Sequence, residues 1–198
     1  MKLITTIDDI VSEQKFKIQP PTPQEFPSDY LGKGSGFERH IAPNVLKQIK
    51  RINTFSNNAV NIIKKYELFR GKEYICQAGK LTIGYGTLIS KNPKLKGMCI
   101  TEKKASELLI KFVNSDVVPV INSNVKISLT QNQYDALTSL IYNIGSTAFS
   151  ESNLLRMINT NNKRGIIKDW KEFQLADGKV SQGLIRRRKE ELDLFFKK

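Results

Sequence analysis

Three side chains that can take part in acid–base or nucleophilic chemistry lie close together in the chain: Glu67, Cys76 and Thr82, spaced as Glu-x8-Cys-x5-Thr. Glu67 ends an amphipathic pattern beside Tyr66, where apolar neighbours would keep a carboxyl protonated and able to act as a general acid. Ionised Cys76 would be a base or a nucleophile, and the Thr82 hydroxyl could hold a water molecule. Each residue alone also has a simpler interpretation: a surface acid, a buried structural thiol and a hairpin hydroxyl.

The elements that must position these residues are a helix followed by a hairpin. Ser56 or Asn57 can cap a helix that runs through Glu67 and carries an apolar stripe. Two short strands, residues 74–76 and 81–87, are predicted to follow, joined near residues 77–80. The carboxyl of Glu67 would then lie next to the hairpin.

The second predicted strand, LTIGYGT, has one face of small residues. Alternation places Leu81, Ile83 and Tyr85 on one side, and Thr82, Gly84 and Gly86 on the other. Small side chains leave room for a ligand to approach the backbone closely. The alternative is a tight hairpin packed against a helix, in which the glycines serve only the geometry.

The rest of the chain is predicted to be helical. Thr101 begins a helix with an acid in its first turn. The segment LTQNQYDALTSLIYNIG places apolar side chains on one face and stops at Gly145. Three more helices are predicted within residues 152–160, 164–173 and 182–196. A small hairpin followed by a helical bundle is an α+β pattern with segregated elements.

Residues 1–55 differ from the rest of the chain. The stretch IQPPTPQEFPSDYLGKGSG is rich in proline and ends in a Gly-Ser cluster, which favours extended or irregular chain over packed helix. We therefore expect an N-terminal extension over residues 1–55 and one main domain over residues 56–198. The extension could serve docking or delivery, and a disordered tail is the alternative for residues 1–36.

The composition limits the classes of function. The chain has 32 Lys+Arg against 19 Asp+Glu, a net charge of +13 that lies mostly after residue 55. This field favours nucleic acid, an acidic membrane surface or an anionic cell wall, or it is a solvated basic surface. No apolar run reaches the roughly 18 residues of a membrane span, so we expect no stable membrane insertion. The start of the chain lacks the apolar core of a signal peptide.

Taken together, these residues resemble the glycoside hydrolase family 24 lysozymes, the phage-type lysozymes or endolysins. The family pattern Glu-x8-Asp/Cys-x5-Thr, continued as TIGYGH, is similar to the Glu67, Cys76 and Thr82 pattern with its IGYG. Two later segments also resemble family motifs in the same order: LTQNQYDALTSLIYNIGSTAF at residues 129–149 and GLIRRRKEELDLF at residues 183–195. The resemblance covers about residues 56–196.

The resemblance implies a lysozyme-like fold, in which an active-site cleft separates a small β-lobe from a helical bundle. It implies hydrolysis of the β-1,4 bond between N-acetylmuramic acid and N-acetylglucosamine in peptidoglycan, which causes lysis. Glu67 would be the general acid, Cys76 would act on a water molecule or stabilise the transition state, and Thr82 would help to position that water. The residues expected to bind substrate or support the site are Arg70, Gly84, Gly86, Tyr142, Asn143 and Arg187. Arg187 would do so by orienting Glu67, and no metal or cofactor is implied.

Two positions depart from the commoner family pattern. Cys76 stands where most members have Asp, and Thr87 stands where they have His. A thiol is mostly neutral at pH 7 unless nearby cations favour its ionisation, and Arg70 and Lys72 are close in sequence. An alternative is therefore a catalytically impaired peptidoglycan-binding or delivery module. A disulfide between Cys76 and Cys99 would act as a redox lock.

A basic nucleic-acid-binding protein is a further class that fits the charge. It leaves the Glu, Cys and Thr pattern unexplained, and no helix-turn-helix or zinc pattern supports it. We therefore expect peptidoglycan as the partner, no nucleic acid, a monomer, and a protein partner only for residues 1–55. An enzyme made in the host cytoplasm without a signal peptide would reach the periplasmic or extracellular wall after release or injection.

Overall fold

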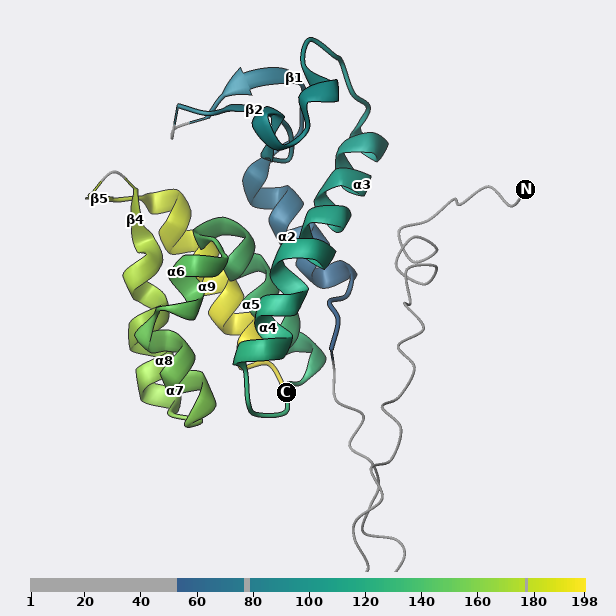
Figure 1. The fold of residues 1–198 in the computed structure, drawn as a ribbon. Coiled ribbons are helices and arrows are strands. Elements are labelled where there is room, and N and C mark those ends of the chain that lie inside the picture. The colour runs from purple at the N-terminus through teal and green to yellow at the C-terminus, as the bar shows by residue number, and fades with distance from the viewer. Residues whose placement is uncertain (1–52, 77–78, 177) are drawn as a thin grey trace, which may run out of the picture. The chain divides into compact units, whose positions relative to one another are not determined.

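The computed structural model describes residues 53–76, 79–176 and 178–198. Most of the expected N-terminal extension, residues 1–52, lies outside the described residues. Figure 1 shows a small sheet at one end of the described chain and a helical bundle at the other, with α2 and α3 running between them. The α+β arrangement expected from the sequence is confirmed.

The elements follow one another in a simple order. The first part holds α2 (Asn57–Glu67), β1 (Arg70–Ile75), β2 (Leu81–Gly84) and β3 (Thr87–Leu88). The bundle holds α3 (Glu102–Phe112), α4 (Val118–Asn124), α5 (Gln131–Ile144), α6 (Ser146–Ser150), α7 (Asn153–Asn159), α8 (Lys163–Trp170) and α9 (Gln182–Phe195). A π-helical turn (Val113–Val117) joins α3 to α4, and the short strands β4 (Leu175–Ala176) and β5 (Lys179–Val180) lie between α8 and α9.

The start of α2 is fixed by its cap. Ser56 Oγ accepts a hydrogen bond from the backbone N–H of Asn58, and the Ser56 N–H donates to Asp135 Oδ1 at 2.7 Å. Asp135 is fully buried on α5, so the cap ties the first turn of α2 to the centre of the bundle. The predicted cap and the predicted helix end at Glu67 are both confirmed.

Helix α5 forms the centre of the hydrophobic core. A capping box between Thr130 and Gln133 starts the helix, and Gly145, with a φ of 90°, ends it. The helix packs chiefly against α9 and α2. Its buried apolar residues are Tyr134, Ala136, Leu137, Leu140 and Ile141. The core thus connects the helix that carries Glu67 with the helix that carries the arginine run.

The sheet differs from the predicted hairpin. Strand β1 begins at Arg70 rather than at residue 74, and it pairs antiparallel with β2. The single strand predicted over residues 81–87 is two strands, β2 and β3, which pair antiparallel with each other. The chain reverses between them through Gly84 and Gly86, whose φ angles of 69° and 93° disfavour any other residue.

The small-residue face of β2 is covered at Gly84, where the sequence suggested room for a ligand. A Cβ atom on Gly84 would stand 3.0 Å from Ala105 Cβ and 3.3 Å from Ile100 Cδ1. Gly84 therefore allows β2 to pack closely against α3. Alternation along a strand shows which residues share a face, but it does not show which helix covers that face.

Candidate active site

Glu67 is placed at the boundary between the bundle and the sheet. It is the last residue of α2, and the chain leaves the helix through Leu68, whose φ is 54°. A positive φ is uncommon for a residue with a branched side chain, and such conformations concentrate at functional sites. The Glu67 side chain is 23% exposed, so it is shielded but reachable.

One oxygen of Glu67 is held by Arg187 from α9. Arg187 Nη1 donates to Glu67 Oε1 at 2.6 Å, and Arg187 Nη2 donates to the carbonyl oxygen of Ser139 at 3.1 Å. The guanidinium also lies over the Tyr66 ring, 5.5 Å from its centroid, and the Arg187 side chain is 3% exposed. The carboxyl therefore has a buried cation beside it, and this cation is the arginine that the resemblance implied would orient it.

The other oxygen of Glu67 faces the turn between β2 and β3. A Cβ atom on Gly86 would stand 3.8 Å from Glu67 Oε2 and 3.9 Å from the Tyr142 hydroxyl. Tyr142 donates to the carbonyl oxygen of Tyr85 at 2.6 Å. Burial raises the pKa of Tyr142, and the nearby Glu67 and Tyr74 add to this shift, which the cation of Arg187 opposes. Gly86 and Tyr142 therefore border the carboxyl.

Cys76 and Thr82 share one face of the β1–β2 hairpin. Thr82 pairs with Tyr74 across the ladder, and directly opposed residues project to the same face. Cys76 comes two residues after Tyr74, and its N–H extends the pairing by donating to the carbonyl oxygen of Lys80 at 2.9 Å. Tyr74 of this face is close enough to Tyr142 of α5 to contribute to the raised pKa of Tyr142.

The Cys76 thiol and the Thr82 hydroxyl differ in solvent exposure. Cys76 is a free thiol of intermediate exposure. Thr82 is only 2% exposed, and its hydroxyl donates to the carbonyl oxygen of Tyr74 at 3.1 Å. The Thr82 proton is thus already used, so its oxygen remains only as a hydrogen-bond acceptor.

Two other predicted site residues, Arg70 and Asn143, contact neighbouring side chains. The exposed Arg70 guanidinium lies over the Tyr74 ring, 4.7 Å from its centroid. Asn143 is exposed, and its Oδ1 accepts from Arg188 Nη2 at 2.9 Å. This bond fixes the amide orientation, so the nitrogen of Asn143 is the end that can donate to a ligand.

A disulfide between Cys76 and Cys99, which the sequence left open, does not fit this arrangement. Both cysteines are free thiols. Cys99 precedes Ile100, whose N–H donates to the carbonyl oxygen of Gly71 at 2.8 Å. Gly71 lies near the start of β1 and Cys76 directly follows its end, about 15 Å apart at the rise of an extended strand. A disulfide requires Cα atoms within about 7 Å.

A buried charge network behind Arg187 was not predicted from the sequence. Arg188 and Glu191 are both fully buried on α9, and Arg188 Nε lies 2.9 Å from Glu191 Oε2. Glu191 Oε1 also accepts from Arg187 Nε at 3.2 Å. The spacing of these residues, three and four apart, was the signal that could have revealed the network.

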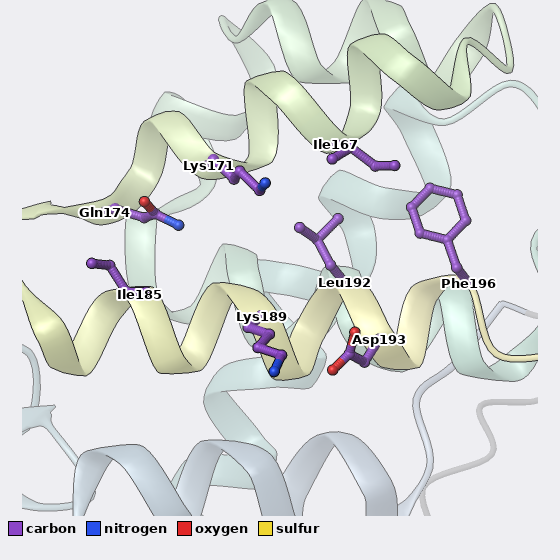
Figure 2. A pocket seen from close by; sticks show the side chains of 8 residues that line it. All are labelled: Ile167, Lys171, Gln174, Ile185, Lys189, Leu192, Asp193 and Phe196. Atoms are coloured by element: carbon purple, nitrogen blue, oxygen red, sulfur yellow. The ribbon is translucent and has the colours of Figure 1, made fainter.

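A separate groove lies between α8 and α9, with a volume of about 670 Å³. Figure 2 shows Ile167 and Lys171 projecting from α8 and its following turn toward Leu192 of α9. The remaining lining residues are Gln174, Ile185, Lys189, Asp193 and Phe196. None of the predicted site residues lines this groove, so it is not the candidate active site.

The described part of the chain has no group of three His, Cys, Asp or Glu side chains that could hold a metal ion. Within the same residues, no helix has the length and apolar character needed to cross a membrane.

The fold and the candidate site are typical of a lysozyme. Residues 64–191 match the family model described as "Phage lysozyme". An endolysin from Acyrthosiphon pisum secondary endosymbiont phage 1 is 39% identical over 144 residues, which cover 71% of this chain and 96% of the relative. An endolysin from Salmonella phage P22 is 39% identical over 142 residues, with the same coverage of each chain.

A solved structure shows the same likeness. The muramidase domain of SpmX from Asticaccaulis excentricus has a TM-score of 0.65 and 33% identity, covering 73% of this chain and 99% of that domain. The chain belongs to the phage lysozyme family. It is an enzyme of the lysozyme class, a muramidase that hydrolyses peptidoglycan.

Proposed function

We propose that Glu67 is the general acid of this lysozyme and that Arg187 determines which of its oxygens carries the proton. The observation that supports this is the 2.6 Å hydrogen bond from Arg187 Nη1 to Glu67 Oε1. An oxygen that accepts this bond serves as the carbonyl oxygen of a neutral carboxyl. The acidic proton then resides on Oε2, which faces Gly86 and Tyr142.

The reaction begins when Glu67 Oε2 gives its proton to the glycosidic oxygen while the bond from that oxygen to the muramic acid C1 breaks. The proton transfer leaves a carboxylate on Glu67. Arg187 stabilises this carboxylate by a charge-assisted hydrogen bond that is stronger than the bond to the neutral carboxyl. The guanidinium thus favours the transition state over the ground state.

Cys76 acts from the hairpin on the other side of the bond. Its thiolate accepts a proton from a water molecule as the water oxygen bonds to C1, and Thr82 positions that water through its free acceptor capacity. The products are a reducing muramic acid end and a free hydroxyl on the N-acetylglucosamine. Exchange with solvent returns the proton to Glu67 and removes it from Cys76. Tyr142, Asn143 and Arg70 contact the substrate in this proposal. Gly86 lies against Glu67 Oε2 and Tyr142, and Gly84 packs against α3.

The decisive experiment compares purified peptidoglycan digested by the wild type and by Glu67→Gln, with the fragments identified by mass spectrometry. We expect muropeptides with reducing muramic acid ends from the wild type only. Release of stem peptides, or full activity of Glu67→Gln, would overturn the assignment. The anomeric form of the first product, read by NMR, separates water attack aided by Cys76 from attack by the sulfur itself.

We also propose a role for residues 1–55 and the cell wall as the place where the enzyme acts. Residues 1–55 serve as a docking or delivery segment, and the enzyme works as a monomer on the cell wall after release or injection. The basic charge supports wall association, because the wall carries phosphate and carboxylate groups. Sedimentation of the full chain with and without purified walls tests both the monomer and the association.

A further inference from the structure

Glu191 has an unusual set of contacts for a residue that no solvent reaches. The side chain is 0% exposed. Its Oε1 accepts from Ser139 Oγ at 2.7 Å, Arg187 Nε at 3.2 Å and Arg188 Nη2 at 3.2 Å. Its Oε2 accepts from Trp170 Nε1 at 3.2 Å and lies 2.9 Å from Arg188 Nε. A buried carboxylate is tolerated only when it is compensated as fully as this.

Glu191 joins two buried arginines that reach different places. Arg187 continues to Glu67, whereas Arg188 continues to Asn143 and to the carbonyl oxygen of Phe173. Burial is the main cause that lowers the pKa of Arg188, which still leaves it charged at neutral pH. Two guanidinium groups and two carboxylates therefore form a cluster with no net charge when Glu67 is ionised.

The cluster fixes the direction of Arg187. Its Nε is held by Glu191 and its Nη2 by the Ser139 carbonyl, so its Nη1 is the nitrogen left to meet Glu67. Without the carboxylate of Glu191, the adjacent charges of Arg187 and Arg188 would repel each other. The guanidinium of Arg187 would also lose the partner that sets its rotation.

We propose that Glu191 is a positioning residue for the glycosidase reaction, which holds Arg187 against Glu67 and balances the charge around the catalytic acid. This inference rests on the proposed roles of Glu67 and Arg187. The purely structural alternative is a buried polar network that only stabilises the contact between α5, α8 and α9. The two interpretations differ in what they predict for the pH dependence of catalysis.

The charged and titratable groups around Glu67 determine the direction in which the pH dependence of catalysis should change. Glu67 faces Arg187 from α9 and Tyr142 from α5, and Tyr66 precedes it on α2. Glu191 faces Arg187 and Arg188, while Ser139 of α5 and Trp170 of α8 are neutral. Glu190 points elsewhere and pairs with Lys65 and Tyr66.

The first variant is Glu191→Gln, which keeps an acceptor oxygen but removes one negative charge. The cluster then gains one positive charge, which favours the ionised form of Glu67. The alkaline limb of kcat/KM against pH should therefore move to lower pH by about one unit. The matched control is Glu190→Gln, the same change at the neighbouring residue, which should leave the limb in place.

The second variant is Arg188→Gln, which removes a positive charge and should move the alkaline limb upward. The double variant Glu191→Gln/Arg188→Gln restores the balance and should return the limb toward that of the wild type. If Glu191→Gln does not fold, Arg188→Gln alone still tests the direction in which the alkaline limb moves. Equal shifts in the same direction, or no shift in either single variant, would overturn the proposal and support the structural alternative.

The failure of this inference is separable from that of the proposed function. An active Glu67→Gln variant would remove the basis of both. An inactive Glu67→Gln variant together with unchanged pH profiles would remove only the role of Glu191. The assay is the initial rate of reducing-end release from purified peptidoglycan at low substrate concentration, measured on the full chain.

Discussion

Arg187 Nη1 lies 2.6 Å from Glu67 Oε1, although the two residues are 120 positions apart in the sequence. The contact joins the end of α2 to the middle of α9 across the core helix α5. The acid is therefore fixed by the packing of three helices rather than by its local sequence. This dependence is why substitutions remote from the hairpin should affect catalysis.

Removal of the cation beside Glu67 should impair the chemical step. We expect Arg187→Met to lower kcat on peptidoglycan by about 10²-fold, the usual cost of one electrostatic partner at a reacting group. Arg187→Lys should lose less activity than Arg187→Met, because lysine keeps the positive charge but lacks the paired N–H donors of the guanidinium. The control is Arg186→Met in the same arginine run, since Arg186 is exposed. A loss of equal size in the control would contradict the role given to Arg187.

The thiol of Cys76 should be required for lysis, whereas that of Cys99 should not. We expect Cys76→Ser to lose about 10²-fold in rate, because a serine hydroxyl is a far weaker base than a thiolate. Cys76→Asp should retain activity, since a carboxylate can accept the same proton. Cys99→Ser is the control, because Cys99 is an exposed free thiol on a different segment. Lysis by Cys76→Ser at the wild-type rate would rule out a catalytic thiol.

Most helices could be predicted from the sequence because their signals are local, whereas α4 and the short α6 were not predicted. Ser56, Thr101 and Thr130 cap helices as their residue types suggest, and apolar spacing gave the faces that form the core. The face of β2 could not be predicted in the same way, since contact with α3 depends on packing between distant segments. Burial of Glu191 beside two arginines also arises only when α5, α8 and α9 come together.

Gly84 should matter for stability through one close contact. Gly84 and Gly97 have similar φ angles, 69° and 72°, but only Gly84 has neighbours within 4 Å of an added Cβ. Substitution by Ala should cost about 1–2 kcal/mol of backbone strain at either site. At Gly84, the clash with Ala105 should add about 1–3 kcal/mol. Urea unfolding of both variants measures the difference, and equal losses would show that β2 does not pack tightly against α3.

The contact between α2 and α9 should weaken at high pH because of Tyr66. The Tyr66 hydroxyl donates to Glu190 Oε2 at 2.7 Å, and burial first, then Glu190, raises the pKa of Tyr66 to about 12. An unfolded tyrosine has a pKa near 10, so between about pH 10 and 12 the folded state binds more protons than the unfolded state. The free energy of unfolding should therefore fall as pH rises through this range.

Tyr66→Phe removes the titrating group, so its free energy of unfolding should fall less steeply than that of the wild type over the same range. Glu190→Gln should give an intermediate slope, because burial still acts on Tyr66 after the charged acceptor is gone. Urea unfolding at pH 9, 10 and 11 measures the three slopes, and the comparison cancels the lysines that titrate in every variant. Identical slopes for the wild type and Tyr66→Phe would mean that the hydroxyl ionises alike in both states, and the bond to Glu190 would not join α2 to α9 in solution.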